Sequence, residues 1–208
     1  MASFLMHLYV GKFCKDRCKR ITSAPQFYLG CINPDCVNAF GTAPKEVRWP
    51  AHLRASDTNE WIENNKAFYR DNTGKIDESL LLGFVIHNIT DAAYDEHFNK
   101  SIPREDWQRF GQEQSKKAWW THEVLPALKL ARPVEINGNS PEHVQKWLAS
   151  RTDGSRFDDF DDKPRHLTME IMNELSEIVS CIVKSRATQR RRRLREGFSS
   201  SGIFWGGG

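Results

Sequence analysis

One long apolar segment limits what this chain can fold into. Residues 78–98, ESLLLGFVIHNITDAAYDEHF, carry apolar side chains nearly all round a helical projection, and Asp77 precedes them as a candidate N-cap. A helix that is apolar on every side has to be buried by other elements. With 208 residues, the chain is long enough for one domain with its own hydrophobic core. The sequence therefore predicts a buried central helix surrounded by other helices.

Helical spacing recurs along most of the remaining chain, and no segment alternates in the manner of a β-strand. Residues 27–41 are predicted to form a short helical or extended run, and residues 42–54 a loop. Pro126 should end or kink the helix that contains it. The fold class we expect is all-α, a single-domain multi-helix bundle with a metal site between its helices. Besides 78–98, the predicted helices cover residues 3–20, 56–70, 103–131, 140–150 and 164–196.

The chain is expected to divide into a helical core and C-terminal additions. Residues 1–150 form the core, and the polar, acidic run 151–163 forms a surface loop. Residues 164–196 form a helix that packs on the core, and residues 197–208 form a flexible tail.

The end of this last helix is strongly basic. Residues 186–195 hold six arginines and no acid, although the net charge of the whole chain is only +3. The run is either a solvated helix end, where cations suit the macrodipole, or a contact for anionic lipid or nucleic acid. In the second case the contacting residues would be Arg190, Arg191, Arg192 and Arg193. Because the rest of the chain is not basic, a uniformly basic nucleic-acid binder is excluded.

No apolar stretch of the sequence approaches the roughly 18–20 residues that span a bilayer. The first residues have no basic segment before their apolar positions, so we interpret them as an amphipathic helix and not as a signal peptide. We therefore expect a cytoplasmic protein whose five cysteines are reduced. A thiolate zinc site is a weaker alternative, because its spacings of three and four intervening residues are looser than the usual two. That site would use Cys14, Cys18, Cys31 and Cys36.

Two residues in the buried helix can bind a metal together. His87 and Asp91 are four residues apart, so both project from one helical face and could share a divalent ion. His97 comes ten residues after His87 and points about 80° away from it, which suits a second ion better. Burying a charged carboxylate without a partner costs several kcal/mol of folding free energy, so a buried Asp91 needs a metal or an arginine beside it. The alternative is that His87 and Asp91 form an ordinary pair on the surface.

Four further residues offer nitrogen or oxygen ligands from distant segments. His7 lies in the first helix, Asp35 follows a proline, His52 lies in the predicted loop and His122 lies late in the long helix. Each alone is more often structural or exposed. A set of nitrogen and oxygen ligands without cysteine favours hydrolytic zinc over a closed structural site.

The segment LLLGFVIHNITDAAYDEHF resembles the core motif of the zinc-dependent phospholipase C family, which is related to the S1/P1 nucleases. FYLGCINPDC is similar to that family's Leu-Gly-x-x-x-Pro-Asp element. WPAHLR, which contains His52, resembles the short His element that follows it in the family. MHLYVGK, which contains His7, resembles the family's N-terminal His element. The resemblance covers residues 1–130. It implies a zinc-dependent phosphoric-ester hydrolase with ligands His7, Asp35, His52, His87, Asp91, His97 and His122.

By this resemblance, the protein holds one to three zinc ions. Asp35, His52, His87 and Asp91 would hold one of them. Asp91 would bridge to another that also takes His7, and His97 with His122 would hold the remaining one. Asp35 is in addition the expected catalytic residue, since it could orient or deprotonate the attacking water. The chain departs from the family at Pro126, where other members place a Glu.

The substrate expected from the resemblance is a phosphodiester of a phospholipid or a related compound. A metal-dependent nuclease of the S1/P1 type is the alternative within the same chemistry. Outside that chemistry, the chain could be a non-catalytic helical module that binds anionic partners through its arginine-rich helix, with structural histidines.

Overall fold

The computed structural model describes residues 4–98, 102–152 and 168–183. Across these residues the fold is an all-α bundle, as predicted, and it contains no strand beyond two isolated β-bridges. A helix over residues 169–183 is the last described element. The preceding elements are α1 (Phe4–Lys15), α2 (Ala24–Gly30), the 3-10 helix η1 (Asn33–Asn38), α3 (Lys45–Ala51), α4 (Thr58–Asn72), α5 (Glu78–His97), α6 (Arg104–Ser115), the π-helix η2 (Trp119–Val124), α7 (Leu125–Leu130) and α8 (Pro141–Thr152).

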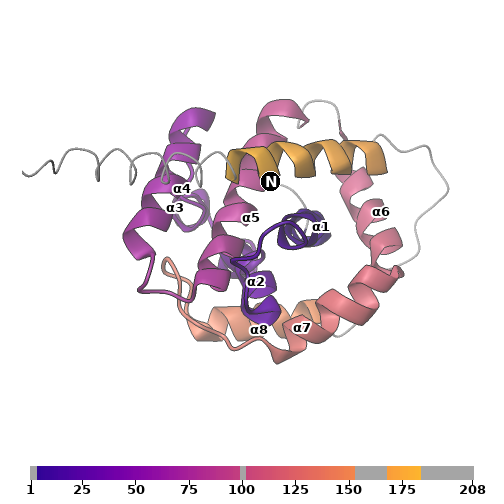
Figure 1. Ribbon diagram of the computed structural model, residues 1–208. Coiled ribbons are helices and arrows are strands. Elements are labelled where there is room, and N and C mark those ends of the chain that lie inside the picture. Colours follow the sequence, from indigo (N-terminus) through magenta and orange to yellow (C-terminus); the bar gives the residue numbers. More distant parts are fainter. Residues whose placement is uncertain (1–3, 99–101, 153–167, 184–208) are drawn as a thin grey trace, which may run out of the picture.

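Helix α5 is the central helix, and the prediction of a buried helix is confirmed. Every residue from Ser79 to Tyr94 is buried, which explains why this segment is apolar on all sides. Asp77 caps the helix, since its carboxylate accepts a hydrogen bond of 2.9 Å from the main-chain N–H of Leu80. Helices α1, α2 and α4 pack directly against α5. Figure 1 shows α6, α7 and α8 following one another around α1.

The crossing of α2 and α5 leaves no room for side chains at two positions. A Cβ atom on Gly30 would lie 2.2 Å from the carbonyl oxygen of Leu80, and one on Gly83 would lie 2.1 Å from that of Phe27. Glycine is required at both positions because the two backbones are in direct contact. This contact holds Cys31 and the following helix η1 against α5.

The prediction of a loop over residues 42–54 was wrong, because this segment contains α3. Pro44 starts the helix with an extended conformation, and its carbonyl accepts hydrogen bonds from Val47 and Arg48 at 3.1 and 3.0 Å. Pro50 lies in the last turn of the helix. In so short a helix its missing N–H removes one hydrogen bond near the end and does not prevent the first turn from forming.

The long helix predicted over 103–131 is divided into α6, η2 and α7. The chain leaves α6 at Ser115, well before Pro126, which lies in the first turn of α7. Pro126 has no N–H to donate to the preceding turn. Directly before it, the N–H of Leu125 bonds to the carbonyl of Trp120, five residues back, which is the π-helical pattern. The first helix is also shorter than predicted and ends at Lys15.

The predicted C-terminal helix is described in part. Residues 169–183 are helical, and Met172, Leu175 and Val179 are fully buried in the core. The acidic run from residue 153 onward, the arginine-rich run 186–195 and the tail 197–208 lie outside the described residues. Among the helices that the structure describes, none has the length and apolar character needed to cross a bilayer.

Replacing Gly83 by Ala should destabilise the protein strongly, because the new methyl group would meet the main chain of α2. Overpacking of this kind costs about 3 kcal/mol or more where backbone cannot yield. Gly74→Ala is the control, since nothing lies within 4 Å of its Cβ position and only its φ of +80° opposes a side chain, a cost of about 1 kcal/mol. Urea unfolding followed by circular dichroism measures both. Equal stabilities for the two variants would contradict the close helix contact.

Candidate metal centre

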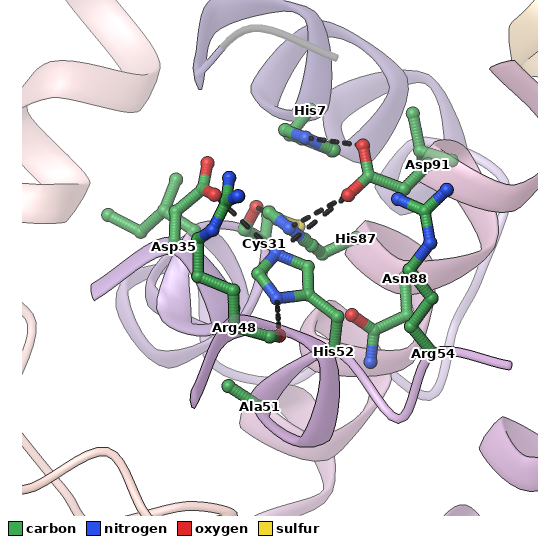
Figure 2. Close-up of polar contacts among 12 residues, drawn as sticks. His7, Cys31, Asp35, Arg48, Ala51, His52, Arg54, His87, Asn88 and Asp91 are labelled. Carbon is green, nitrogen blue, oxygen red and sulfur yellow. Dashed lines mark hydrogen bonds and ion pairs between the residues drawn. The ribbon is translucent and has the colours of Figure 1, made fainter. Parts of the chain in front are cut away.

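Five of the residues predicted as ligands meet in the interior. They come from four segments: α1, η1, the C-cap of α3, and α5. Figure 2 shows their side chains pointing toward a common centre. All of them are buried, with between 0 and 9% of each residue exposed. We call this set the His–Asp cluster, and its members are His7, Asp35, His52, His87 and Asp91.

The ligand atoms of the His–Asp cluster form two overlapping groups. His7, His87 and Asp91 make up one, and Asp35, His52 and His87 make up the other; within each group the atoms lie within 4.8 Å of one another. His87 belongs to both. Either group is compact enough for its members to bind one ion after small adjustments.

The carboxylate of Asp91 faces both groups. Its Oδ1 lies 3.4 Å from Nε2 of His7, whereas its Oδ2 lies 3.8 Å from Nε2 of His52 and 3.8 Å from Nε2 of His87. The spacing of four residues between His87 and Asp91 therefore brings the two side chains together, as predicted. The rings of His7 and His87 stack with their centroids 3.7 Å apart. A carboxylate with one oxygen on each side can bridge two ions.

Main-chain carbonyls orient two of the histidines. Nδ1 of His87 donates to the carbonyl of Cys31 at 2.8 Å, and Nδ1 of His52 donates to the carbonyl of Arg48 at 2.8 Å. Because a carbonyl only accepts, the proton is on Nδ1 in both rings and the lone pair on Nε2 is directed into the cluster. Metal-binding histidines are commonly oriented in this way.

Several ring nitrogens in the cluster have no hydrogen-bond partner among the described residues. They are Nε2 of His52, Nε2 of His87 and both ring nitrogens of His7. Buried polar atoms are nearly always satisfied, so atoms left without a partner require an explanation. Imidazole nitrogens converging with carboxylates, with no thiolate among them, form a donor set that fits zinc.

The electrostatics of the histidines suit ligands. Burial, and next the neighbouring His7, lower the pKa of His87 to about 3, so its ring is neutral at neutral pH. Burial also acts to lower the pKa of His52, but the nearby carboxylate of Asp35 outweighs it and the pKa is raised. A metal ion beside Asp35 would compete with a proton for the lone pair on Nε2 of His52.

Both carboxylates of the cluster are ionised. Burial acts to raise their pKa values, but in each case the neighbouring histidines outweigh it. The pKa of Asp35 is lowered chiefly by His52, and that of Asp91 is held well below its usual range chiefly by His7. Metal binding requires carboxylates in this form.

Asp35 is the member of the cluster that solvent reaches. Its side chain is 12% exposed, against at most 2% for the side chains of the other four residues. Oδ1 of Asp35 lies 3.5 Å from Nε2 of His52. The open edge of the cluster is therefore at Asp35, the residue expected to act on water.

His97 and His122 do not join the cluster. His97 is the last residue of α5 and is exposed, and His122 is exposed on η2. Ten residues of helix separate His97 from His87 by about 15 Å along the axis. Neither residue belongs to a group of possible ligands within the described parts of the chain. The two residues expected to hold a third ion therefore lie at the surface, and no other ligand joins either of them among the residues that the structure describes.

Three of the cysteines, Cys14, Cys31 and Cys36, are buried in the hydrophobic core. Cys14, Cys18, Cys31 and Cys36 form no disulfide, and among the described residues none of them belongs to a group of possible metal ligands. Burial raises the pKa of Cys31 and of Cys36 well above the usual range, so both stay protonated. This agrees with reduced packing cysteines and not with the thiolate alternative.

The groups that orient the ligands could not be predicted from the sequence. The carbonyls of Cys31 and Arg48 cannot be identified from the sequence, because every residue has a main-chain carbonyl. Arg48 could have been related to His52 by its spacing of four residues, had α3 been predicted as a helix. Asp95, one turn after Asp91, has a different role: it forms an ion pair of 2.6 Å with Arg54.

Comparison with known proteins does not place the chain in a family. No protein-family model, no curated protein and no solved structure matches it. The assignment of chemistry to the His–Asp cluster therefore depends on the geometry above and on the resemblance of its motifs.

Replacing Asp91 by Asn should remove zinc from the protein, because Asp91 is the anion that faces both ligand groups. Loss of an outer partner alone weakens metal binding about 10- to 100-fold, so we expect loss of this ligand to cost at least about 100-fold. Metal analysis and zinc titration of the purified variant measure the effect. The control is Asp95→Asn, the same change one turn further along α5, which should bind zinc like the original protein. Unchanged zinc affinity in Asp91→Asn would show that the cluster is not the metal site.

Proposed function

We propose that the His–Asp cluster binds zinc and that the protein is a zinc-dependent phosphoric-ester hydrolase. One observation carries the proposal: five buried nitrogen and oxygen ligands from four segments converge, while the lone pairs of two rings are directed inward by main-chain carbonyls. The motif resemblance supports phosphoric esters as the substrate class.

Two zinc positions are supported by the two ligand groups. Asp35, His52 and His87 would hold one ion, and His7 would hold the other. Asp91 would contribute one carboxylate oxygen to each. Bound zinc supplies Lewis acidity toward a phosphoryl oxygen and lowers the pKa of water toward neutrality.

The residues of the chain have separate tasks in this proposal. Asp35 lies at the open edge with an ionised carboxylate, so one of its oxygens can accept the proton of the attacking water. The buried side chains of His7, His87 and Asp91 keep the inner side of the cluster free of bulk water. Substrate therefore approaches from the side of Asp35.

The proposal includes two candidate substrates that carry a phosphoric ester. A phospholipid is the first candidate substrate and a nucleic acid the second, as the resemblance implies. A cytoplasmic location and an anionic contact through Arg190 to Arg193 remain predictions from the sequence.

Hydrolysis should depend on metal. We expect turnover of bis-p-nitrophenyl phosphate, and of either dihexanoylphosphatidylcholine or single-stranded DNA, to stop after treatment with a chelator and to return with added zinc. Asp35→Asn should lower kcat by about 100- to 10,000-fold, the usual contribution of a general base. Asp95→Asn should leave kcat unchanged. Turnover that persists after the metal has been removed would refute the proposal, as would a protein that takes up no zinc.

A further inference from the structure

Arg48 lies on the side of α3 that faces the His–Asp cluster. The N–H of His52 bonds to the carbonyl of Arg48 at 3.1 Å, so helical geometry continues through His52. Residues four apart share a helical face, and His52 points into the cluster. Figure 2 shows the Arg48 guanidinium extending toward the Asp35 edge, away from the carbonyl that holds His52.

The guanidinium of Arg48 has no acceptor within the described residues. Its Nε is buried without a hydrogen bond, and none of the described carboxylates forms an ion pair with it. Arg54, by contrast, pairs with Asp95 at 2.6 Å. A buried donor that lacks an acceptor is unfavourable, and a charged one more so.

The nearby carboxylate of Asp35 does not supply the missing acceptor. Its Oδ1 faces Nε2 of His52 at 3.5 Å, and no ion pair links Asp35 to Arg48. Arg48 is also only partly buried, so a small solute can reach it. The position combines a fixed positive charge, unused donors and access from solvent beside the open edge of the cluster.

We propose that Arg48 binds the phosphoryl group of the substrate, an inference that rests on the proposed function. The planar guanidinium presents two parallel N–H groups whose spacing matches two oxygens of a phosphate. Bound there, the phosphoryl group lies beside Asp35, which acts on water in the proposed reaction. A carboxylic ester offers no anionic pair of oxygens, so Arg48 selects phosphoric esters.

The experiment compares Arg48→Gln and Arg48→Lys with the original protein, all loaded with zinc. Calorimetric titration with inorganic phosphate measures binding without turnover. A charge-assisted bidentate contact predicts phosphate affinity about 10- to 100-fold lower in Arg48→Gln. Arg48→Lys should recover part of this loss, because lysine keeps the positive charge but lacks the two parallel N–H groups of the guanidinium. Arg70→Gln, an exposed arginine on α4 with a 73% exposed side chain, is the matched control and should bind phosphate normally.

Zinc content and kinetics in the same samples separate the two proposals. All variants should hold the same zinc, and Arg48→Gln should raise KM for bis-p-nitrophenyl phosphate. The loss in kcat/KM should be similar for dihexanoylphosphatidylcholine or dithymidylate, whichever is hydrolysed, since both carry the phosphodiester. A zinc-loaded, active protein whose phosphate affinity is unchanged in Arg48→Gln overturns the role of Arg48 alone. A protein without zinc or turnover overturns the hydrolase proposal and this inference with it.

Discussion

The direct backbone contact between α2 and α5 at Gly30 and Gly83 determines where the ligands of the cluster lie. It brings the carbonyl of Cys31 onto His87 and fixes the start of η1, which carries Asp35. Helix α3 packs on η1 and ends at Ala51, with His52 as its C-cap. Three ligands from separate segments are thus aligned by one crossing where the absence of two side chains allows main chains to touch.

Much of the fold and the central part of the site could be predicted from the sequence. The buried helix followed from apolar residues on all of its faces, and the pairing of His87 with Asp91 followed from a spacing of four. His7, Asp35 and His52 could be named as possible ligands from their residue types, but only the motif resemblance joined them to His87 and Asp91, because nothing local in the sequence determines which distant segments meet. Their convergence in the interior is what the structure adds.

The remaining features depend on tertiary context. Two prolines made residues 42–54 resemble a loop, yet a seven-residue helix forms there because the main-chain hydrogen bonds of its first turn and its packing on η1 outweigh one lost hydrogen bond. Because α3 was not predicted, the position of Arg48 one helical turn before His52 was not predicted either. His97 shared a motif with His87, but the straight continuation of α5 takes it to the surface. Ten residues of regular helix place the two side chains about 15 Å apart along the axis, so membership of one motif does not bring them to one ion.

The position of His87 in both ligand groups has a consequence for how the site would fill. Its Nδ1 is engaged by Cys31, so a single lone pair remains for two possible ions. With this lone pair, the ion beside Asp35 and His52 would have four protein donors, counting one oxygen of Asp91, whereas the ion beside His7 would have two. Two ions would therefore be held unequally, and occupancy would rise in two steps as the metal concentration increases. At scarce metal, the half-filled site would be the prevailing species.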